Sequence, residues 1–152
     1  MDLSEYVRRP DLEVPLEVSD KIVRHHLHYG NFVRKKLSEP LIVSQNSGYR
    51  HPDHEKEKGR KGSEHEFGKN SKGAVDYTVS GKNRSKKAIL ERLNKLCDLL
   101  FKYTPYTRIT LYPTKLFIHA DYRKTEDGKR HYYEAKEDKN GKVTWKFIKH
   151  IN

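Results

Sequence analysis

The apolar residues of this chain are concentrated in a few short runs, and the longest run has the spacing of a helix. Across residues 85–103 they recur at three- and four-residue steps and form one stripe, made up of Ile89, Leu90, Leu93, Leu96, Cys97, Leu100 and Phe101. Hydrophobic residues are only 34% of the 152-residue chain, so a core can form only where such runs meet. We therefore expect one domain built around this helix, with Cys97 as a small buried hydrophobe.

A second amphipathic helix is predicted over about residues 19–37. Its apolar residues recur at three- to five-residue steps, and Ser19 or Asp20 is a suitable N-cap. Gly30 is the point at which this helix could be interrupted, and Pro40 stops it. Residues 1–19 contain Pro10, Pro15 and scattered acidic residues. They predict an extended lead-in with at most a short helix, so the packed domain is expected to be residues 20–152.

The remaining apolar runs are short and have strand character. They predict strands at residues 41–43, 74–79, 108–112, 116–121, 131–134 and 143–148. Residues 138–141 (Asp-Lys-Asn-Gly) predict a hairpin turn before the last strand. Two early helices and a late succession of strands indicate a single α+β domain, with a mainly antiparallel sheet and two principal helices packed on it.

Residues 45–73 predict one long loop of about 29 residues, because they contain five glycines and almost no large apolar residue. A loop of that length inside a compact domain is usually functional or mobile.

The chain is basic, with 32 Lys and Arg against 21 Asp and Glu, a formal net charge of +11. Such a charge predicts attraction to an anionic partner such as nucleic acid, a membrane surface or a cell-wall polymer. The basic residues are interleaved with acidic ones, and the sequence contains no basic arm, RNA-binding aromatic motif or Cys/His finger. Nucleic acid is therefore disfavoured as the main partner.

The sequence also predicts where the protein is made. No apolar stretch approaches the roughly 18–20 residues needed to cross a bilayer, so no membrane span is expected. The N-terminal residues lack the apolar region of a secretion signal, and the single cysteine excludes an intrachain disulfide. We expect cytoplasmic synthesis without a signal peptide.

Three residues stand out among the nine histidines and many acids of the chain. His65 lies in the long loop, Asp76 lies in the strand that follows it, and His119 is in mid-strand. Alternation along that strand places His119 and Asp121 on one face, where a carboxylate can assist a ligand histidine. By contrast, His25, His26 and His28 on the first helix are expected to be solvated.

Four blocks of sequence occur in an order that resembles a known family. They are Ser47-Gly48-Tyr49-Arg50, Ser63-Glu64-His65, Gly73-Ala74-Val75-Asp76 and Phe117-Ile118-His119-Ala120-Asp121. In this order they resemble the zinc D-alanyl-D-alanine carboxypeptidase family (peptidase M15-like), related to the Hedgehog signalling domain, and especially its small bacterial and phage members. The resemblance extends over about residues 20–121, and it implies a Hedgehog/DD-peptidase-like fold and hydrolysis of peptidoglycan.

The resemblance implies that His65, Asp76 and His119 are the three protein ligands of one Zn²⁺. Two imidazoles and one carboxylate leave a fourth tetrahedral position open for water, as in catalytic zinc sites. Zinc lowers the pKa of such a water to about 7, which supplies a nucleophile for an amide carbonyl at neutral pH.

The resemblance also implies roles for neighbouring residues. Arg50 corresponds to an arginine that helps to bind the substrate and to stabilise charge on the carbonyl oxygen, a role that suits a permanently charged guanidinium. Ser63 corresponds to a serine in the substrate site. Asp121 is placed to orient a ligand histidine and raise its basicity.

The general base is left open by the sequence. Several relatives have an acidic residue three positions before the last ligand histidine, where this chain has Leu116. Asp121 is the first choice of base, followed by Glu66 and Asp53. The alternative is a domain that binds zinc without efficient hydrolysis.

The sequence-based hypothesis is thus a zinc metallopeptidase that cuts peptidoglycan peptides, as a carboxypeptidase or an endopeptidase. Its basic charge would concentrate it on an anionic cell-wall polymer. The resemblance favours a phage or bacterial enzyme that acts on the wall after release or as a virion component. The alternatives are a zinc-binding, catalytically weak structural module of a phage particle and a basic nucleic-acid-associated protein.

Overall fold

The structure is a computed structural model that describes residues 1–7, 13–44 and 47–151, with the backbone alone at residues 150 and 151. Pro10, which belongs to the lead-in expected from the sequence, lies outside these residues. The described helices are η1 (Leu3–Tyr6), α1 (Leu16–Ile22), η2 (Val23–Leu27), α2 (His28–Leu37), α3 (Pro52–Glu57), η3 (Glu64–Glu66) and α4 (Lys86–Tyr103). The described strands are β1 (Leu41–Val43), β2 (Ala74–Val79), β3 (Arg108–Tyr112), β4 (Phe117–Asp121), β5 (Arg130–Glu137) and β6 (Val143–Ile151).

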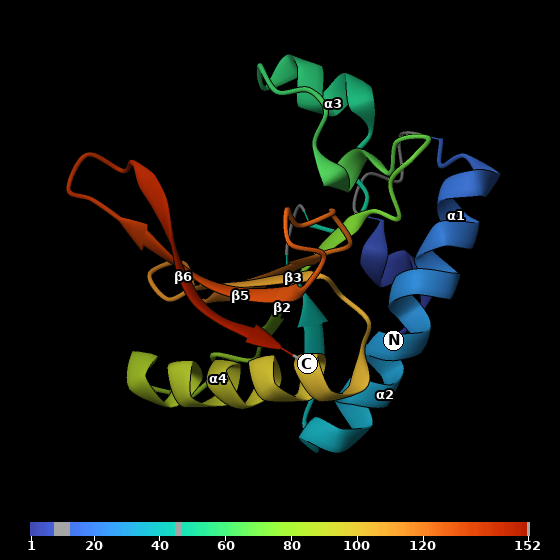
Figure 1. The fold of residues 1–152 in the computed structure, drawn as a ribbon. Helices are drawn as coiled ribbons and strands as arrows, with labels where there is room; N and C mark the ends of the chain where they lie inside the picture. The colour runs from blue at the N-terminus through green and yellow to red at the C-terminus, as the bar shows by residue number, and fades with distance from the viewer. Residues whose placement is uncertain (8–12, 45–46, 152) are drawn as a thin grey trace.

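The six strands form one sheet in the order β1-β2-β4-β3-β5-β6. The pair β3 and β5 is parallel, and the other four neighbouring pairs are antiparallel. Helix α4 runs along one face of the sheet, the continuous helix from α1 to α2 flanks it, and α3 stands on the other side (Figure 1). The prediction of an α+β domain with a mainly antiparallel sheet and two principal helices is confirmed.

Helix α4 forms the centre of the core, as its apolar stripe predicts. The Ser85 hydroxyl caps the helix by accepting a hydrogen bond from the backbone N–H of Ala88 at 3.1 Å. The side chains that α4 and the adjoining strands bury completely include Leu93, Leu96, Leu100, Ile109 and Ile118. Cys97 is buried as expected, and this burial raises the pKa of its thiol to about 12, so the thiol is unreactive at neutral pH.

The first helix is longer than the sequence predicts. It begins at Leu16, with Pro15 rather than Ser19 or Asp20 at the N-cap, and it runs without a break through the π-helical segment η2 to Leu37. Gly30 does not interrupt it. Instead, Gly30 leaves room for a neighbour, because a Cβ there would lie 2.4 Å from the Tyr6 hydroxyl oxygen.

The N-terminal residues take part in the core. Asp2 and Glu5 form a capping box around η1, the short helix that the lead-in was expected to allow. Tyr6 is fully buried, and its hydroxyl lies 3.2 Å from that of Tyr77 in β2. Among the described residues before position 20, Tyr6 and Val18 therefore pack in the core of the domain.

His26 is not solvated, contrary to the sequence-based expectation. Its side chain is completely buried, its Nε2 lies 2.8 Å from the Lys72 carbonyl, and its Nδ1 lies 2.8 Å from the Tyr106 hydroxyl. Because a carbonyl only accepts, Nε2 donates to Lys72 and the neutral ring accepts from Tyr106. Burial lowers the pKa of His26 to about 3, so the ring stays neutral in the folded protein.

His26 should therefore destabilise the protein in mild acid. Below about pH 6.5 the unfolded chain takes up a proton on His26 that the folded chain refuses, so the free energy of unfolding falls as pH falls. Between pH 7 and pH 5 the titration of His26 should lower the free energy of unfolding by about 2 kcal/mol. We expect that difference to disappear in His26→Gln, whose amide can make both hydrogen bonds without titrating. Urea unfolding of both metal-free proteins at the two pH values measures it, and equal pH dependence in the two would contradict it.

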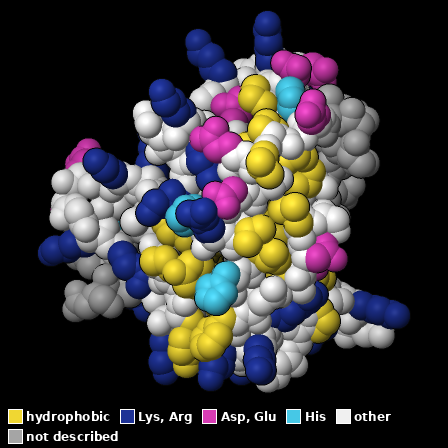
Figure 2. All heavy atoms as spheres, turned by 90° about the vertical axis from the view of Figure 1, so that its right-hand side faces the viewer, with side chains coloured by type: hydrophobic (Ala, Val, Ile, Leu, Met, Phe, Trp, Pro, Cys, Tyr) yellow, Lys and Arg dark blue, Asp and Glu magenta, His cyan; other side chains and the backbone are white. Residues whose placement is uncertain are grey.

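Residues 45–73 are more structured than the predicted loop. The described part contains α3 and η3, and Glu55 in α3 is fully buried. No helix among the described residues is long and apolar enough to cross a membrane. On the face shown in Figure 2, Lys and Arg side chains are dispersed with acidic side chains among them, which agrees with the interleaved charges of the sequence.

Candidate metal centre

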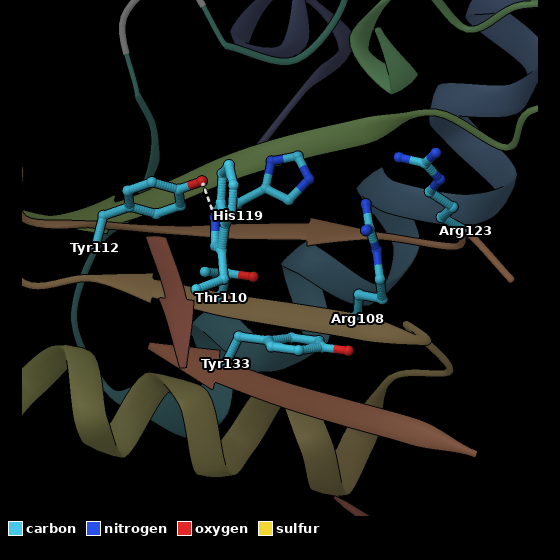
Figure 3. Close-up of a pocket in the computed structure, with 7 residues that line it drawn as sticks. Arg108, Thr110, Tyr112, His119, Arg123 and Tyr133 are labelled. Atoms are coloured by element: carbon cyan, nitrogen blue, oxygen red, sulfur yellow. Dashed lines mark hydrogen bonds between the residues drawn. The ribbon is translucent and has the colours of Figure 1, made fainter. Parts of the chain in front are cut away.

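The register of the sheet places two of the three expected ligands opposite each other. Strands β2 and β4 are antiparallel neighbours, and Asp76 is paired directly with His119. Residues on one face of a strand alternate with those on the other, so the buried Ile118 and Ala120 face α4 while His119 faces the opposite side. Figure 3 shows His119 on that side of the sheet, above β3 and away from α4. The Asp76 and His119 side chains thus meet on the face that none of the long described helices covers.

His65 is brought to this pair by the 3-10 turn η3. The backbone carbonyl of His65 accepts from the Arg50 N–H at 2.8 Å, and its Nδ1 lies 2.9 Å from the Gly48 carbonyl oxygen. Phe67 follows the turn and buries its ring against Gly73, where a Cβ would lie 2.1 Å from that ring. The glycine thus allows the close packing that holds the His65 turn against β2.

The segment Ser47–Arg50 contacts both η3, which carries His65, and β2, which carries Asp76. The Ser47 hydroxyl accepts a hydrogen bond from the Asp76 backbone N–H at 2.5 Å. The Gly48 carbonyl fixes the His65 ring, as above, and Gly48 itself has φ +78°, a conformation that favours glycine. The sequence block that carried the family resemblance therefore has a structural role, because it ties η3 to β2.

The three side chains converge on one point. The Nε2 atom of His65 lies 3.3 Å from Nδ1 of His119 and 3.5 Å from Oδ1 of Asp76, and the His119 and Asp76 atoms are 2.8 Å apart. Donor atoms bound tetrahedrally to one zinc at about 2.0–2.1 Å would be about 3.3 Å from one another. The spacing of these two nitrogens and one oxygen therefore fits a zinc-sized ion.

The hydrogen bonds behind the cluster determine which ring nitrogens face it. His65 donates its Nδ1 proton to the Gly48 carbonyl, so the Nε2 of the neutral ring presents a lone pair. The Nε2 of His119 lies 2.8 Å from the Asp121 carboxylate and donates to it, so its Nδ1 presents a lone pair when the ring is neutral. Two lone pairs and the Asp76 carboxylate then point at one another, an arrangement that calls for a cation between them.

The pKa shifts of His119 and Asp76 also agree with a site for a cation. Burial alone would lower the pKa of His119, but its hydrogen bonds to Asp121 and Asp76 outweigh burial and raise the pKa to about 9. Burial would raise the pKa of Asp76, but its electrostatic interaction with His65 and its hydrogen bond with His119 hold that pKa well below its usual value. Asp76 is therefore ionised, which is the state in which a carboxylate can bind a metal ion.

Asp121 lies behind His119 rather than beside the converging atoms. Its side chain is fully buried, and the Arg108 guanidinium contacts both carboxylate oxygens. The Arg123 backbone N–H also donates to Oδ1 at 2.9 Å. This placement suits a residue that orients His119. It does not suit the general base for which the sequence made Asp121 the first choice, because both carboxylate oxygens are already engaged.

Arg50 lies at the cluster, as the family resemblance implies. Its guanidinium is 3.4 Å from Oδ2 of Asp76 and 3.4 Å from Oε1 of Glu55. Glu55 also pairs with Arg60 at 2.6 Å. Glu55 was not predicted as a site residue, because it stands in a run of alternating charges typical of a solvated helix. Only its position five residues after Arg50 could have suggested the contact.

The other expected site residues are placed differently. The Ser63 hydroxyl accepts from the His65 N–H at 3.2 Å and caps η3, so its observed partner is the backbone. Leu116 lies in the turn before β4, where its carbonyl accepts from the Thr78 hydroxyl at 2.7 Å. Asp53 is exposed beside His51, and Glu66 is half-buried.

A pocket of about 350 Å³ lies over the converging atoms. Among the described residues, those that line it are Arg50, His65, Asp76, Tyr112, Lys115, Phe117, His119, Val143 and Trp145. Asp76 is the one carboxylate among these lining residues, and it is already an expected zinc ligand. The described lining therefore offers no other acidic residue as a general base in place of the one that relatives have at the position of Leu116. The cluster is open to a ligand through this pocket.

Comparisons of the chain with protein-family models, with curated proteins and with solved structures found no match.

Proposed function

We propose that the protein is a zinc-dependent peptidase, similar to the D-alanyl-D-alanine carboxypeptidase family, that hydrolyses amide bonds of peptidoglycan peptides. The observation that carries this proposal is the convergence of His65, Asp76 and His119, in which the outer ring nitrogens are already engaged and two ring nitrogens and one carboxylate oxygen face one point. The pocket over that point supports it, because a catalytic zinc site needs an open position for water and substrate.

Zinc at this site would act as a Lewis acid and lower the pKa of water. Residues of the chain would bind the substrate and orient the metal ligands. Arg50 lines the pocket and is held by Glu55 and Asp76, so its guanidinium is placed to donate to a substrate carbonyl. The pair of Asp121 and Arg108 would keep the proton on Nε2 of His119, which leaves Nδ1 for the metal.

A second candidate is a domain that binds zinc without efficient hydrolysis. Its support is that Leu116 stands where relatives have an acidic residue, and that Asp121 is buried between Arg108 and His119. In both cases we propose that the basic charge concentrates the protein on an anionic wall polymer. The protein would reach the wall after release from a lysed cell or as part of a phage particle.

Metal analysis together with peptidoglycan digestion separates these functions. Purified protein loaded with zinc is analysed by mass spectrometry for metal content and incubated with peptidoglycan, with and without a chelator. We expect one zinc per chain and release of peptide fragments that the chelator stops and added zinc restores. One zinc without any release would favour the second candidate. A chain that takes up no zinc would refute the metal site.

Asp121 should control zinc affinity without contacting the metal. The substitution Asp121→Asn keeps the shape of the side chain but removes the carboxylate that accepts the His119 proton, and losses of such outer partners typically cost about 10–100-fold in metal affinity. We expect that loss in a competition titration against a chromogenic chelator. Glu91→Gln, on the exposed side of α4, removes one acidic charge elsewhere and should leave the affinity unchanged. Equal affinities in the two variants would contradict the positioning role.

A further inference from the structure

The pocket over the metal centre is the middle of a longer groove. It shares Arg50, Asp76 and Phe117 with a neighbouring pocket of about 520 Å³. It shares Tyr112, His119 and Trp145 with a second neighbour of about 370 Å³. Because the two sets of shared residues differ, the groove continues past the metal centre in two directions.

One end of the groove is basic. The lining residues of the larger neighbour include Arg50, His54, Lys58 and Arg60. The acidic groups beside them are Glu55, which is fully buried and paired with both arginines, and Asp76, which pairs with Arg50 and is one of the expected zinc ligands. Lys58 adds a further positive charge at the exposed rim. This end would attract a carboxylate of a bound ligand.

The other end is also basic and has aromatic walls. Arg108 and Arg123 line it together with Tyr112, Tyr133 and Trp145. Figure 3 shows the two arginine side chains on the far side of His119 from Tyr112. The Trp145 indole donates to the Tyr112 hydroxyl at 3.0 Å, which joins β6 to β3 across this part of the groove. Arg108 is paired with Asp121, whereas the exposed Arg123 adds positive charge at the rim.

We infer that the bond cut at this site lies inside an extended peptide that continues through both flanking pockets and carries a carboxylate on each side of the cleaved bond. This inference rests on the proposed function and makes the protein an endopeptidase of cross-linked peptides rather than an enzyme that removes a terminal residue. An enzyme of the latter kind needs space for a single residue beyond the metal and one cation for its carboxylate, whereas here each side offers a pocket and cations. Each turnover consumes one water, whose oxygen joins the acyl carbon as the C–N bond breaks, and the leaving nitrogen takes up a proton.

Two defined substrates test the inference. The zinc-loaded protein is incubated with a cross-linked muropeptide dimer and with an uncross-linked muropeptide that ends in D-alanyl-D-alanine, and the products are identified by mass spectrometry. We expect kcat/KM for the dimer to be at least about tenfold higher, with no free alanine from the monomer. Free alanine from the monomer with the dimer left intact would overturn the inference but not the peptidase function. If neither substrate is cut by a protein that holds one zinc, both fail.

The charge requirement is tested by matched variants and a modified substrate. Lys58→Ala and Arg123→Ala each remove one exposed charge at opposite ends of the groove, and each should raise KM for the dimer about fivefold with little change in kcat. Lys95→Ala removes an exposed charge from α4, on the other face of the sheet, and should leave KM unchanged. A dimer whose free carboxylates are converted to carboxamides should be insensitive to Lys58→Ala and Arg123→Ala. Equal KM values for the two dimers in the unsubstituted protein would overturn the assignment of carboxylates.

Discussion

Replacing His119 with alanine is expected to abolish the proposed zinc binding and, with it, the proposed hydrolysis of peptidoglycan. His119 supplies one of three converging donor atoms, and its loss leaves one imidazole and one carboxylate, too few to hold zinc in a three-ligand site. His65→Ala should have the same effect, because it removes the other imidazole of the cluster. Metal analysis after dialysis and a digestion assay measure both losses.

The control for these variants is His28→Ala, which removes an exposed imidazole from α2 and should keep both zinc and turnover. Circular dichroism should show all three variants folded, because the cluster lines a pocket and does not belong to the apolar core. A His119→Ala protein that still carries one zinc per chain and digests peptidoglycan would rule out the metal centre described above.

The largest effect on stability is expected from Leu96→Ala. Leu96 is fully buried on the inner face of α4, and the substitution removes three carbon atoms from a packed site. Lost burial together with the cavity left behind should lower the free energy of unfolding by about 2–5 kcal/mol. Urea denaturation followed by circular dichroism measures this loss.

The matched control is Lys95→Ala, one position earlier on the exposed side of the same helix. It should change the free energy of unfolding by less than about 0.5 kcal/mol. A loss below about 1 kcal/mol for Leu96→Ala would mean that α4 is not the centre of the core.

The elements with clear apolar periodicity were predicted from the sequence at their observed places in the chain. Helix α4 and strand β2 lie within one residue of their predicted bounds, and the β5–β6 hairpin turns where the pattern places it, although each of its strands extends three residues beyond the predicted C-terminal end. Helix α3 was missed because it has six residues and no apolar stripe. It is stabilised by the His51 cap, by Pro52 at its first position and by burial of Glu55 against arginines, and none of these produces a periodic signal.

The candidate site was predicted in part. The four-block resemblance indicated His65, Asp76 and His119, and the structure brings their side chains together. It could not indicate which ring nitrogen faces the cluster, because that depends on the partners Gly48 and Asp121 and hence on the tertiary fold. The ion pair between Asp121 and Arg108 could not be predicted either, because Arg108 lies on a different strand and the sequence does not reveal the register of that strand.

The position of β6 at the end of the sheet has a consequence for how the protein behaves at high concentration. An edge strand offers unpaired backbone groups to any strand of another molecule, and β6 also exposes Trp145, Phe147 and Ile148. Lys142, Lys146 and Lys149 lie along or beside the same strand, so two such edges repel each other. High salt shortens the range of that repulsion, and concentrated solutions of this protein should therefore remain monomeric more readily at low ionic strength than at high.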